Sequence, residues 1–309
     1  MFFRWKTFLK LTIQGNKMKN ILIISSLSMI LLTGLNANEI EMTGETAFLA
    51  YQKMICGTTE EGVTRYGTWE GRAYSRVPGE KDRHIFNVIG INVRQCMKTN
   101  DDIQGRGFRS VSREIQMYLD PTTNEVIDTW KNPWTEKDIE VLHVANDPVN
   151  MRAISYEFDS EGNSSRKMKA RRYGDVIASP TEIPLFYNNA LGGEYQKYVG
   201  GMYHAMEIFN SFYDAEKLIN NSVTNIGESH GGWTRVAQWL PWMEMGDKPG
   251  LMIFNASVFN TFELEKVSER LVDILKNRYP SYLEPPPLND ERPNETSWTV
   301  FKKKLATEN

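Results

Sequence analysis

Between residues 64 and 177 the chain alternates stretches rich in β-branched and aromatic residues with short turn signals. Pro78-Gly79 and Asp120-Pro121 are two of these signals, which separate strands more often than helices. No helical stretch between them is long enough for the crossover that parallel strands require. The pattern therefore predicts seven antiparallel strands, over 64–77, 84–97, 107–119, 125–130, 139–145, 151–158 and 167–177.

The β pattern continues after one interruption rich in proline and glycine. In order, the predicted elements are a loop over 180–193, a strand over 196–213, a helical turn over 214–219, and a closing hairpin of 233–239 with 250–257. Short turns between many strands favour a mainly β fold of the α+β class. We expect an antiparallel meandering sheet or a barrel, calycin-like in outline.

Helical periodicity appears near the two ends of this β-rich region. Residues 43–57 open with a capping threonine and close with a glycine, which predicts a short N-terminal helix. Apolar residues at helical spacing over 263–278 predict a second helix with one apolar face, which Pro280 ends. Asn294 is a candidate cap for a last helical turn. We therefore expect a helical C-terminal extension over 262–309.

The first 37 residues have the pattern of an export signal. Met18 and Lys19 give a basic start, an apolar run follows over 21–32, and the small residue Ala37 ends the segment. The run is too short for a membrane span, which takes about 20 residues. It predicts a Sec-type signal peptide cleaved after Ala37, and hence a periplasmic or secreted protein with no stable membrane span after cleavage.

Residues 1–17 precede this signal and have two interpretations. They are either a long basic leader or an upstream extension from a mis-called start codon, with 18–37 as the true signal. Both interpretations export the chain. No repeat or internal boundary interrupts the remainder, so residues 38–309 are predicted to form a single β-rich domain.

The charge balance excludes two classes of partner. The full chain has 36 basic and 39 acidic residues. Five of the basic residues lie within the first 37, so the remaining 31 face 39 acidic residues and give a net charge of −8. An acidic protein is poorly suited to nucleic acids or anionic membrane surfaces. We expect no nucleic-acid partner.

Cysteine and histidine usage limits redox and metal chemistry. Cys56 and Cys96 are the two cysteines. In an oxidising compartment they can form one disulfide, and two buried free thiols are the open alternative. They form no Cys-x-x-Cys motif, and the four histidines show no set of ligands at metal spacing. We expect neither a metal nor a cofactor.

The densest aromatic stretch covers residues 233–250, where three tryptophans and two methionines surround Arg235. Indole rings and thioethers suit the wall of a cavity for an apolar or aromatic small molecule, and they also suit a corner of the core. On the first interpretation the substrate-binding residues are Trp130, Trp233, Trp239, Trp242 and Met243.

Four residues are candidates for acid–base catalysis. His143 and His204 titrate near neutral pH and can pass protons. Glu207 becomes a base if apolar neighbours raise its pKa, and Arg235 can hold a carboxylate or an enolate-like oxygen. Each also has a structural interpretation, as a hydrogen-bonded histidine or a stacked arginine. If 203–210 is extended, His204 and Glu207 point to opposite faces, whereas a helix would place them together.

Several blocks of the chain carry a resemblance to a known family. They are Trp130-Lys-Asn-Pro-Trp-Thr135, His143-Val-Ala-Asn-Asp-Pro148, Trp233-Thr-Arg235, Leu240-Pro-Trp-Met-Glu-Met-Gly246 and Asn294-Glu-Thr-Ser-Trp298. In this order they resemble the blocks of domain-of-unknown-function family 1838. The resemblance implies an exported single-domain protein without a settled activity, and it supplies no catalytic residue.

Two functional hypotheses follow. The first is a protein that binds an apolar or aromatic small molecule in a Trp/Met-lined cavity without changing it. The alternative is a cofactor-free isomerase, lyase or hydratase that acts on such a molecule by acid–base catalysis in the same cavity. No Gly-x-Ser-x-Gly or phosphate-loop motif points to another reaction class.

Overall fold

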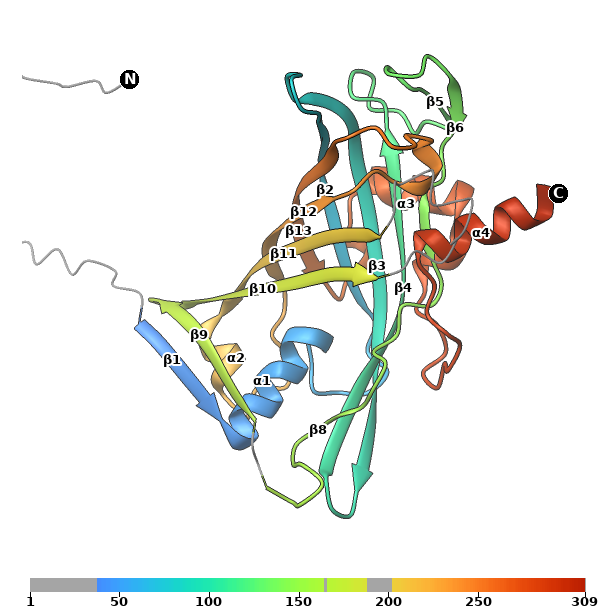
Figure 1. Cartoon of the computed structure of the whole chain (residues 1–309). Coiled ribbons are helices and arrows are strands. Elements are labelled where there is room, and N and C mark those ends of the chain that lie inside the picture. Colours follow the sequence, from blue (N-terminus) through green and yellow to red (C-terminus); the bar gives the residue numbers. More distant parts are fainter. Residues whose placement is uncertain (1–37, 164–165, 188–201, 309) are drawn as a thin grey trace, which may run out of the picture. The chain divides into compact units, whose positions relative to one another are not determined.

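The computed structural model describes residues 38–163, 166–187 and 202–308, all within one compact unit (Figure 1). The predicted signal peptide, 1–37, lies outside the described residues, as does the start of the strand predicted over 196–213. In chain order the elements are β1 (Asn38–Thr43), α1 (Gly44–Cys56), β2 (Arg65–Arg76), β3 (Arg83–Asp101), β4 (Gly105–Leu119), β5 (Thr129–Lys131), β6 (Asp138–Glu140), β7 (Val144–Asn146), β8 (Ser155–Tyr156), β9 (Lys167–Tyr173), β10 (Val176–Tyr187), β11 (Tyr203–Asp214), α2 (Ala215–Ile219), β12 (Ser229–Ala237), η2 (Pro241–Met243), β13 (Leu251–Thr261), η3 (Leu264–Lys266), α3 (Glu269–Arg278), η4 (Pro280–Leu283) and α4 (Ser297–Glu308).

Eleven strands form one antiparallel sheet, which confirms the predicted mainly β, meandering fold. Their order is β1-β9-β10-β11-β12-β13-β2-β3-β4-β7, with β8 on β4, while β5 and β6 pair separately. The described sheet has two unpaired edges, β1 and β7, so it is an open sheet and not the closed barrel that was the alternative prediction. The physical reason lies after β4, where the next strands have two or three residues and are too short to close the ladder.

Two predicted boundaries around β10 differ from the structure. The strand predicted over 167–177 is divided by a turn at Gly174, whose φ of 60° suits glycine. Much of the loop predicted over 180–193 is instead strand, although it contains Pro180 and Pro184. β9 pairs only with residues 176–178 of β10. Beyond them β10 is an edge among the described strands, where a missing proline N–H is tolerated.

The register defines two faces of the sheet, because paired residues point to the same side. One row contains Glu207, Arg235, Phe254, Ala73 and Phe86 on successive strands from β11 to β3. The next row contains Phe209, Trp233, Ala256, Gly71, Val88 and Tyr118, from β11 to β4. We call this side the inner face of the sheet.

The inner face is concave because the sheet is strongly curved. Tyr118 on β4 and Arg235 on β12 are four strands apart, which would be about 19 Å in a flat sheet. They nevertheless lie close enough for the charge of Arg235 to act on the Tyr118 hydroxyl. In one row of this face, Trp69 Nε1 on β2 donates a hydrogen bond of 2.8 Å over Gly90 to Gln116 Oε1 on β4.

Helices cover parts of both faces. On the outer face of the long β3–β4 hairpin, α3 buries Leu271 and Leu275 against Ile91 and Ile115 (Figure 1). The amphipathic pattern predicted this helix, which begins at Glu269 rather than near residue 263. No helix among the described residues is long and apolar enough to cross a membrane.

The predicted N-terminal helix, α1, is anchored at its C-terminal end. Gly57 ends the helix with a φ of 77°. A disulfide joins Cys56 to Cys96 on β3, which decides between the two interpretations of the cysteines. The buried Lys53 ammonium donates hydrogen bonds of 2.9, 3.1 and 2.8 Å to the carbonyl oxygens of residues 217, 218 and 220, at the end of α2. These contacts fix α1 against the sheet.

Candidate functional site

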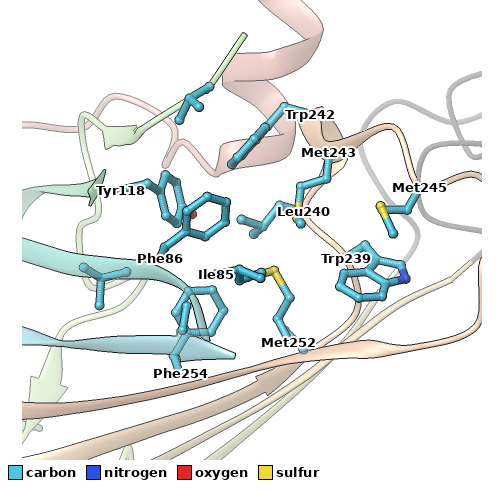
Figure 2. Packing of buried hydrophobic residues seen from close by; sticks show 14 of the residues in the cluster. Ile85, Phe86, Tyr118, Trp239, Leu240, Trp242, Met243, Met245, Met252 and Phe254 are labelled. Atoms are coloured by element: carbon cyan, nitrogen blue, oxygen red, sulfur yellow. The ribbon is translucent and has the colours of Figure 1, made fainter. Parts of the chain in front are cut away.

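Figure 2 shows Trp239 and Trp242, two of the predicted binding tryptophans, in a close-packed group of buried residues; Trp130 belongs to the same cluster. The Trp242 ring lies 5.9 Å from Phe86, 5.4 Å from Tyr118 and 5.9 Å from Trp130 between centroids. Its neighbour Met243 is completely buried. We call this group the indole core, with the members Phe86, Tyr118, Trp130, Trp239, Trp242 and Met243.

Two polar groups at the indole core are hydrogen-bonded, whereas the Tyr118 hydroxyl has no partner among the described residues. Trp239 Nε1 donates a hydrogen bond of 2.9 Å to the Lys248 carbonyl oxygen. Asn132, which is fully buried, donates from Nδ2 to the Met243 carbonyl oxygen at 3.1 Å. Rings that interlock with each other and have satisfied N–H groups stabilise a fold. In the described structure these tryptophans therefore pack as core residues.

A second group of inward side chains is polar and only partly enclosed. We call it the polar hollow, with the members Trp69, Glu114, Gln116, Glu207, Trp233 and Arg235. Its centre is an ion pair between Arg235 Nη1 and Glu207 Oε1, whose side chains retain 22% and 18% of their exposure. Arg235 Nη2 also donates a hydrogen bond of 2.5 Å to the Tyr203 hydroxyl.

The electrostatics of this ion pair keep the arginine charged. Burial opposes the charge on Arg235, but the neighbouring Tyr203 and Glu207 more than compensate and raise the pKa of its guanidinium above the usual value. Two predicted site residues thus meet directly, because Glu207 and Arg235 are register partners on β11 and β12.

Glu114 on β4 adds a second carboxyl group to the hollow. Asn146 Nδ2 donates to its Oε1 at 2.9 Å, and Asn92 Nδ2 approaches its Oε2 at 3.4 Å. Burial is the largest influence and raises the pKa of Glu114, and the negative charge of Glu207 acts in the same direction. The proximity of these two carboxyl groups, five strands apart in the sheet order, is a consequence of the curvature.

Two rings border the polar hollow. The Trp69 and Trp233 rings lie 6.3 Å apart in an edge-to-face arrangement. Trp69 lies against Gly90, where a Cβ atom would come within 2.4 Å of the indole and 2.7 Å of the Ile115 carbonyl oxygen. The glycine therefore allows the Trp69 ring to approach β3 closely.

Some polar atoms here lack partners among the described residues. They are the Trp233 Nε1, Arg235 Nε and Tyr118 Oη atoms, all buried. The Gln116 side chain lies near the Tyr118 hydroxyl, but it makes no hydrogen bond of acceptable geometry there. Unpaired buried donors are unusual in folded proteins.

His143 lies at the edge of the indole core, away from the ion pair. Its Nδ1 accepts a hydrogen bond of 3.2 Å from the Tyr118 backbone N–H, and its ring stacks on Tyr118. Burial lowers the pKa of His143 to about 4, assisted by the charge of Arg278. No described contact links it to Glu207 or Arg235.

His204 lies on the outer face. β11 is extended, so His204 and Glu207 point to opposite sides, as expected for a strand. The exposed His204 ring contacts Phe186 at 4.4 Å. Of the four acid–base candidates, the structure therefore brings together Glu207 and Arg235 and separates both histidines from them.

Three members of the polar hollow were missed in the sequence: Trp69, Glu114 and Gln116. Glu114 and Gln116 are separated by one residue in a predicted strand with buried neighbours, a spacing that places two polar side chains on one face. That spacing was an available signal for an inward polar row, but it does not say what lies opposite.

Two grooves on the described surface lie elsewhere. One of about 620 Å³ lies between Val126 and α3, and one of about 770 Å³ lies beside Pro285–Pro287. Both are on the outer side of the sheet. Among the described residues, no three His, Cys, Asp or Glu side chains gather as a metal site would require.

The comparisons with known proteins place the chain in a family. Its sequence matches the family described as "Protein of unknown function (DUF1838)" over residues 62–305, which contain the sheet from β2 to β13, α3 and most of α4. Comparison with curated proteins finds no match. The extent of the family match covers the indole core and the whole polar hollow, and the chain therefore belongs to the DUF1838 family.

Proposed function

We propose that the protein is exported and binds a ring-bearing small molecule in the polar hollow. The observation that carries this proposal is the inward-facing ion pair of Glu207 and Arg235, which remains partly exposed beside the rings of the inner face. A hollow with apolar walls and a few placed polar groups is the usual composition of a ligand site.

The ion pair is poorly explained by folding alone. Removing two charges from water often costs as much as their attraction returns, so well-packed apolar residues would serve stability as well. The neighbouring Trp69 and Phe209 are only partly buried, although both belong to the inner face. These features favour a site that accepts a guest molecule over a closed core.

The Cys56–Cys96 disulfide supports the export part of the proposal. Disulfides persist mainly in oxidising compartments such as the periplasm or the cell exterior. The predicted signal peptide points to the same compartments. Fractionation of cells that express the full chain, with N-terminal sequencing of the mature protein, tests export and the expected cleavage after Ala37.

A melting-temperature screen tests binding. A ligand that binds the folded state raises the melting temperature by mass action. We expect aromatic or alicyclic compounds to raise it for the wild type, and Arg235→Met to abolish the effect. Arg72→Met is the matched control, because Arg72 is exposed on the outer face of the same sheet. Equal shifts in both variants, or no shift with any compound, would refute binding in the hollow.

One observation favours acid–base catalysis as a second candidate. Glu114 has a raised pKa and lies near Glu207, so the hollow holds two carboxyl groups in different environments. Such a pair can divide the roles of acid and base. In an enolisation, protonated Glu114 would give its proton to a carbonyl oxygen while the Glu207 carboxylate removes one from the adjacent carbon.

Solvent exchange distinguishes catalysis from binding. Enolisation in D2O replaces hydrogen by deuterium beside the carbonyl group, which mass spectrometry detects. We expect exchange in carbonyl compounds that shift the melting temperature, and its loss in Glu114→Gln with binding retained. Binding without exchange in the wild type would eliminate the enzyme and leave the binding protein.

A further inference from the structure

Three buried hydrogen-bond donors that have no acceptor among the described residues border the polar hollow. Trp233 and Arg235 are two residues apart on β12 and share the inner face, so their Nε1 and Nε groups belong to neighbouring rows. The third donor is the hydroxyl of Tyr118, which approaches from β4 across the hollow. Trp233 retains 8% of its exposure and Tyr118 none.

Shared neighbours place the three donors around one part of the inner face. Arg235 interacts electrostatically with Tyr118. Gln116 shares the inner face of β4 with Tyr118 and accepts a hydrogen bond from Trp69. Trp69 in turn contacts the Trp233 ring on β12.

The charges around the donors select the kind of acceptor. Arg235 is already balanced by Glu207, and Glu114 lies nearby. The nearby Arg94 guanidinium acts on Glu114 and donates hydrogen bonds to Asn92 Oδ1 and the Ile55 carbonyl oxygen. A carboxylate ligand would therefore approach two carboxyl groups whose neighbouring cations are already engaged. A neutral oxygen acceptor brings no such repulsion, and preorganised donors of this kind suit a carbonyl oxygen.

We propose that Trp233, Arg235 and Tyr118 bind the carbonyl oxygen of a neutral, ring-bearing ketone or related carbonyl compound, whose ring packs against Trp69 and Phe209. This inference rests on the proposed binding function, whose ligand class it specifies. The carbonyl oxygen would accept hydrogen bonds from donors that have no acceptor among the described residues.

Matched pairs of probes test the inference. Each pair contains a ketone and the hydrocarbon of the same shape: acetophenone with isopropylbenzene, 2-acetylnaphthalene with 2-isopropylnaphthalene, and cyclohexyl methyl ketone with isopropylcyclohexane. Calorimetry and melting temperature measure their binding to the mature protein. In at least one pair we expect the ketone to bind about tenfold more tightly, as a satisfied set of donors would give.

Two variants remove one donor each and keep an aromatic ring, namely Trp233→Phe and Tyr118→Phe. We expect most of the preference for the ketone to be lost in each, with the hydrocarbon bound as before. Tyr74→Phe, on the outer face of β2, is the control for loss of a hydroxyl group. If one donor variant fails to fold, the other still gives the answer.

The outcomes separate this inference from the proposed function. If hydrocarbon and ketone bind equally well in every pair, or if both donor variants retain the preference, the inference is overturned and binding in the hollow survives. If no compound of any pair binds, both fail.

Discussion

The indole core and the polar hollow occupy the same face of one sheet but differ in how completely they are enclosed. Trp239, Trp242 and Met243 retain 2% or less of their exposure. The centre of the hollow, Glu207 and Arg235, retains about a fifth. Ring contacts dominate the first region, whereas charges and unpaired donors dominate the second.

This difference shows that the region densest in aromatic residues is not where the charged and unpaired polar groups gather. Tight packing of large rings stabilises the fold, because each ring buries much apolar area. Partly exposed inward charges contribute little to folding and are consistent with the proposed binding site. The two regions should therefore respond differently to substitution.

The largest effect is expected in the indole core. Trp242→Ala removes a ring that contacts three others and should lower the free energy of unfolding by about 3–5 kcal/mol. Urea denaturation measures the change. Asp247→Ala, at an exposed position of the same loop, should change it by no more than about 0.5 kcal/mol. A small loss for Trp242→Ala would mean that the rings are loosely packed and would remove the distinction between the regions.

The next effect depends on pH and concerns His143. Its pKa is about 4 in the folded state and near 6.5 when unfolded. As the pH falls from 6.5 towards 4, the unfolded chain takes up a proton that the folded chain excludes. Stability should fall over this range by up to about 3 kcal/mol.

The matched variant for this pH effect is His143→Asn. Its side-chain oxygen can still accept the hydrogen bond from the Tyr118 N–H, but it does not titrate. Urea denaturation at several pH values should show a flatter dependence for the variant. The same slope in both proteins would contradict the burial of a neutral histidine beside the indole core.

A smaller effect is expected where the wall of the hollow is tightest. Gly90→Ala places a methyl group against Trp69 and a backbone oxygen and should cost about 1–3 kcal/mol. Gly232→Ala is the control, because a Cβ there meets no atom closer than 4.0 Å and alanine suits a strand better than glycine. Equal stability of the two variants would show that Trp69 moves freely.

The smallest stability change should come from removing the ion pair as a unit. Arg235→Met with Glu207→Leu should leave stability within about 1 kcal/mol of the wild type while binding is lost. Arg235→Met alone should cost more, because Glu207 is left unpaired. A large loss of stability in the double variant would mean that the ion pair stabilises the fold. The polar hollow would then not differ from the indole core in this respect.

Much of the fold was predictable because its signals are local. The turns and β-branched stretches predicted β2, β3 and β4, and β12 with β13 formed the expected closing hairpin. The capping residues predicted α1, and the apolar face predicted α3. The error at β10 arose because Pro180 and Pro184 predicted a loop. In the structure they lie where β10 is an edge strand, and this edge exists because β9 pairs only with residues 176–178.

The candidate site was predictable only in part. Glu207 and Arg235 were identified from their residue types, and their pairing required the register of β11 with β12. The spacing of Glu114 and Gln116 signalled an inward polar row, but not that Glu207, from a strand about 90 residues later, lies near Glu114. His204 was also a candidate, but side chains alternate along β11, so His204 points to the outer face, away from Glu207.

The sequence by itself determined the strand-rich fold and the family, since these depend on neighbouring residues or on blocks in a fixed order. The export signal stays a prediction from the sequence. Only the tertiary structure decided that the cysteines pair and that the tryptophans near residue 240 pack as core. It alone brought Glu114 near Glu207 and Arg235 near Tyr118. The physical reason is curvature, because the bend of a sheet sums small twists over many strands and no short stretch of sequence encodes which distant side chains then meet.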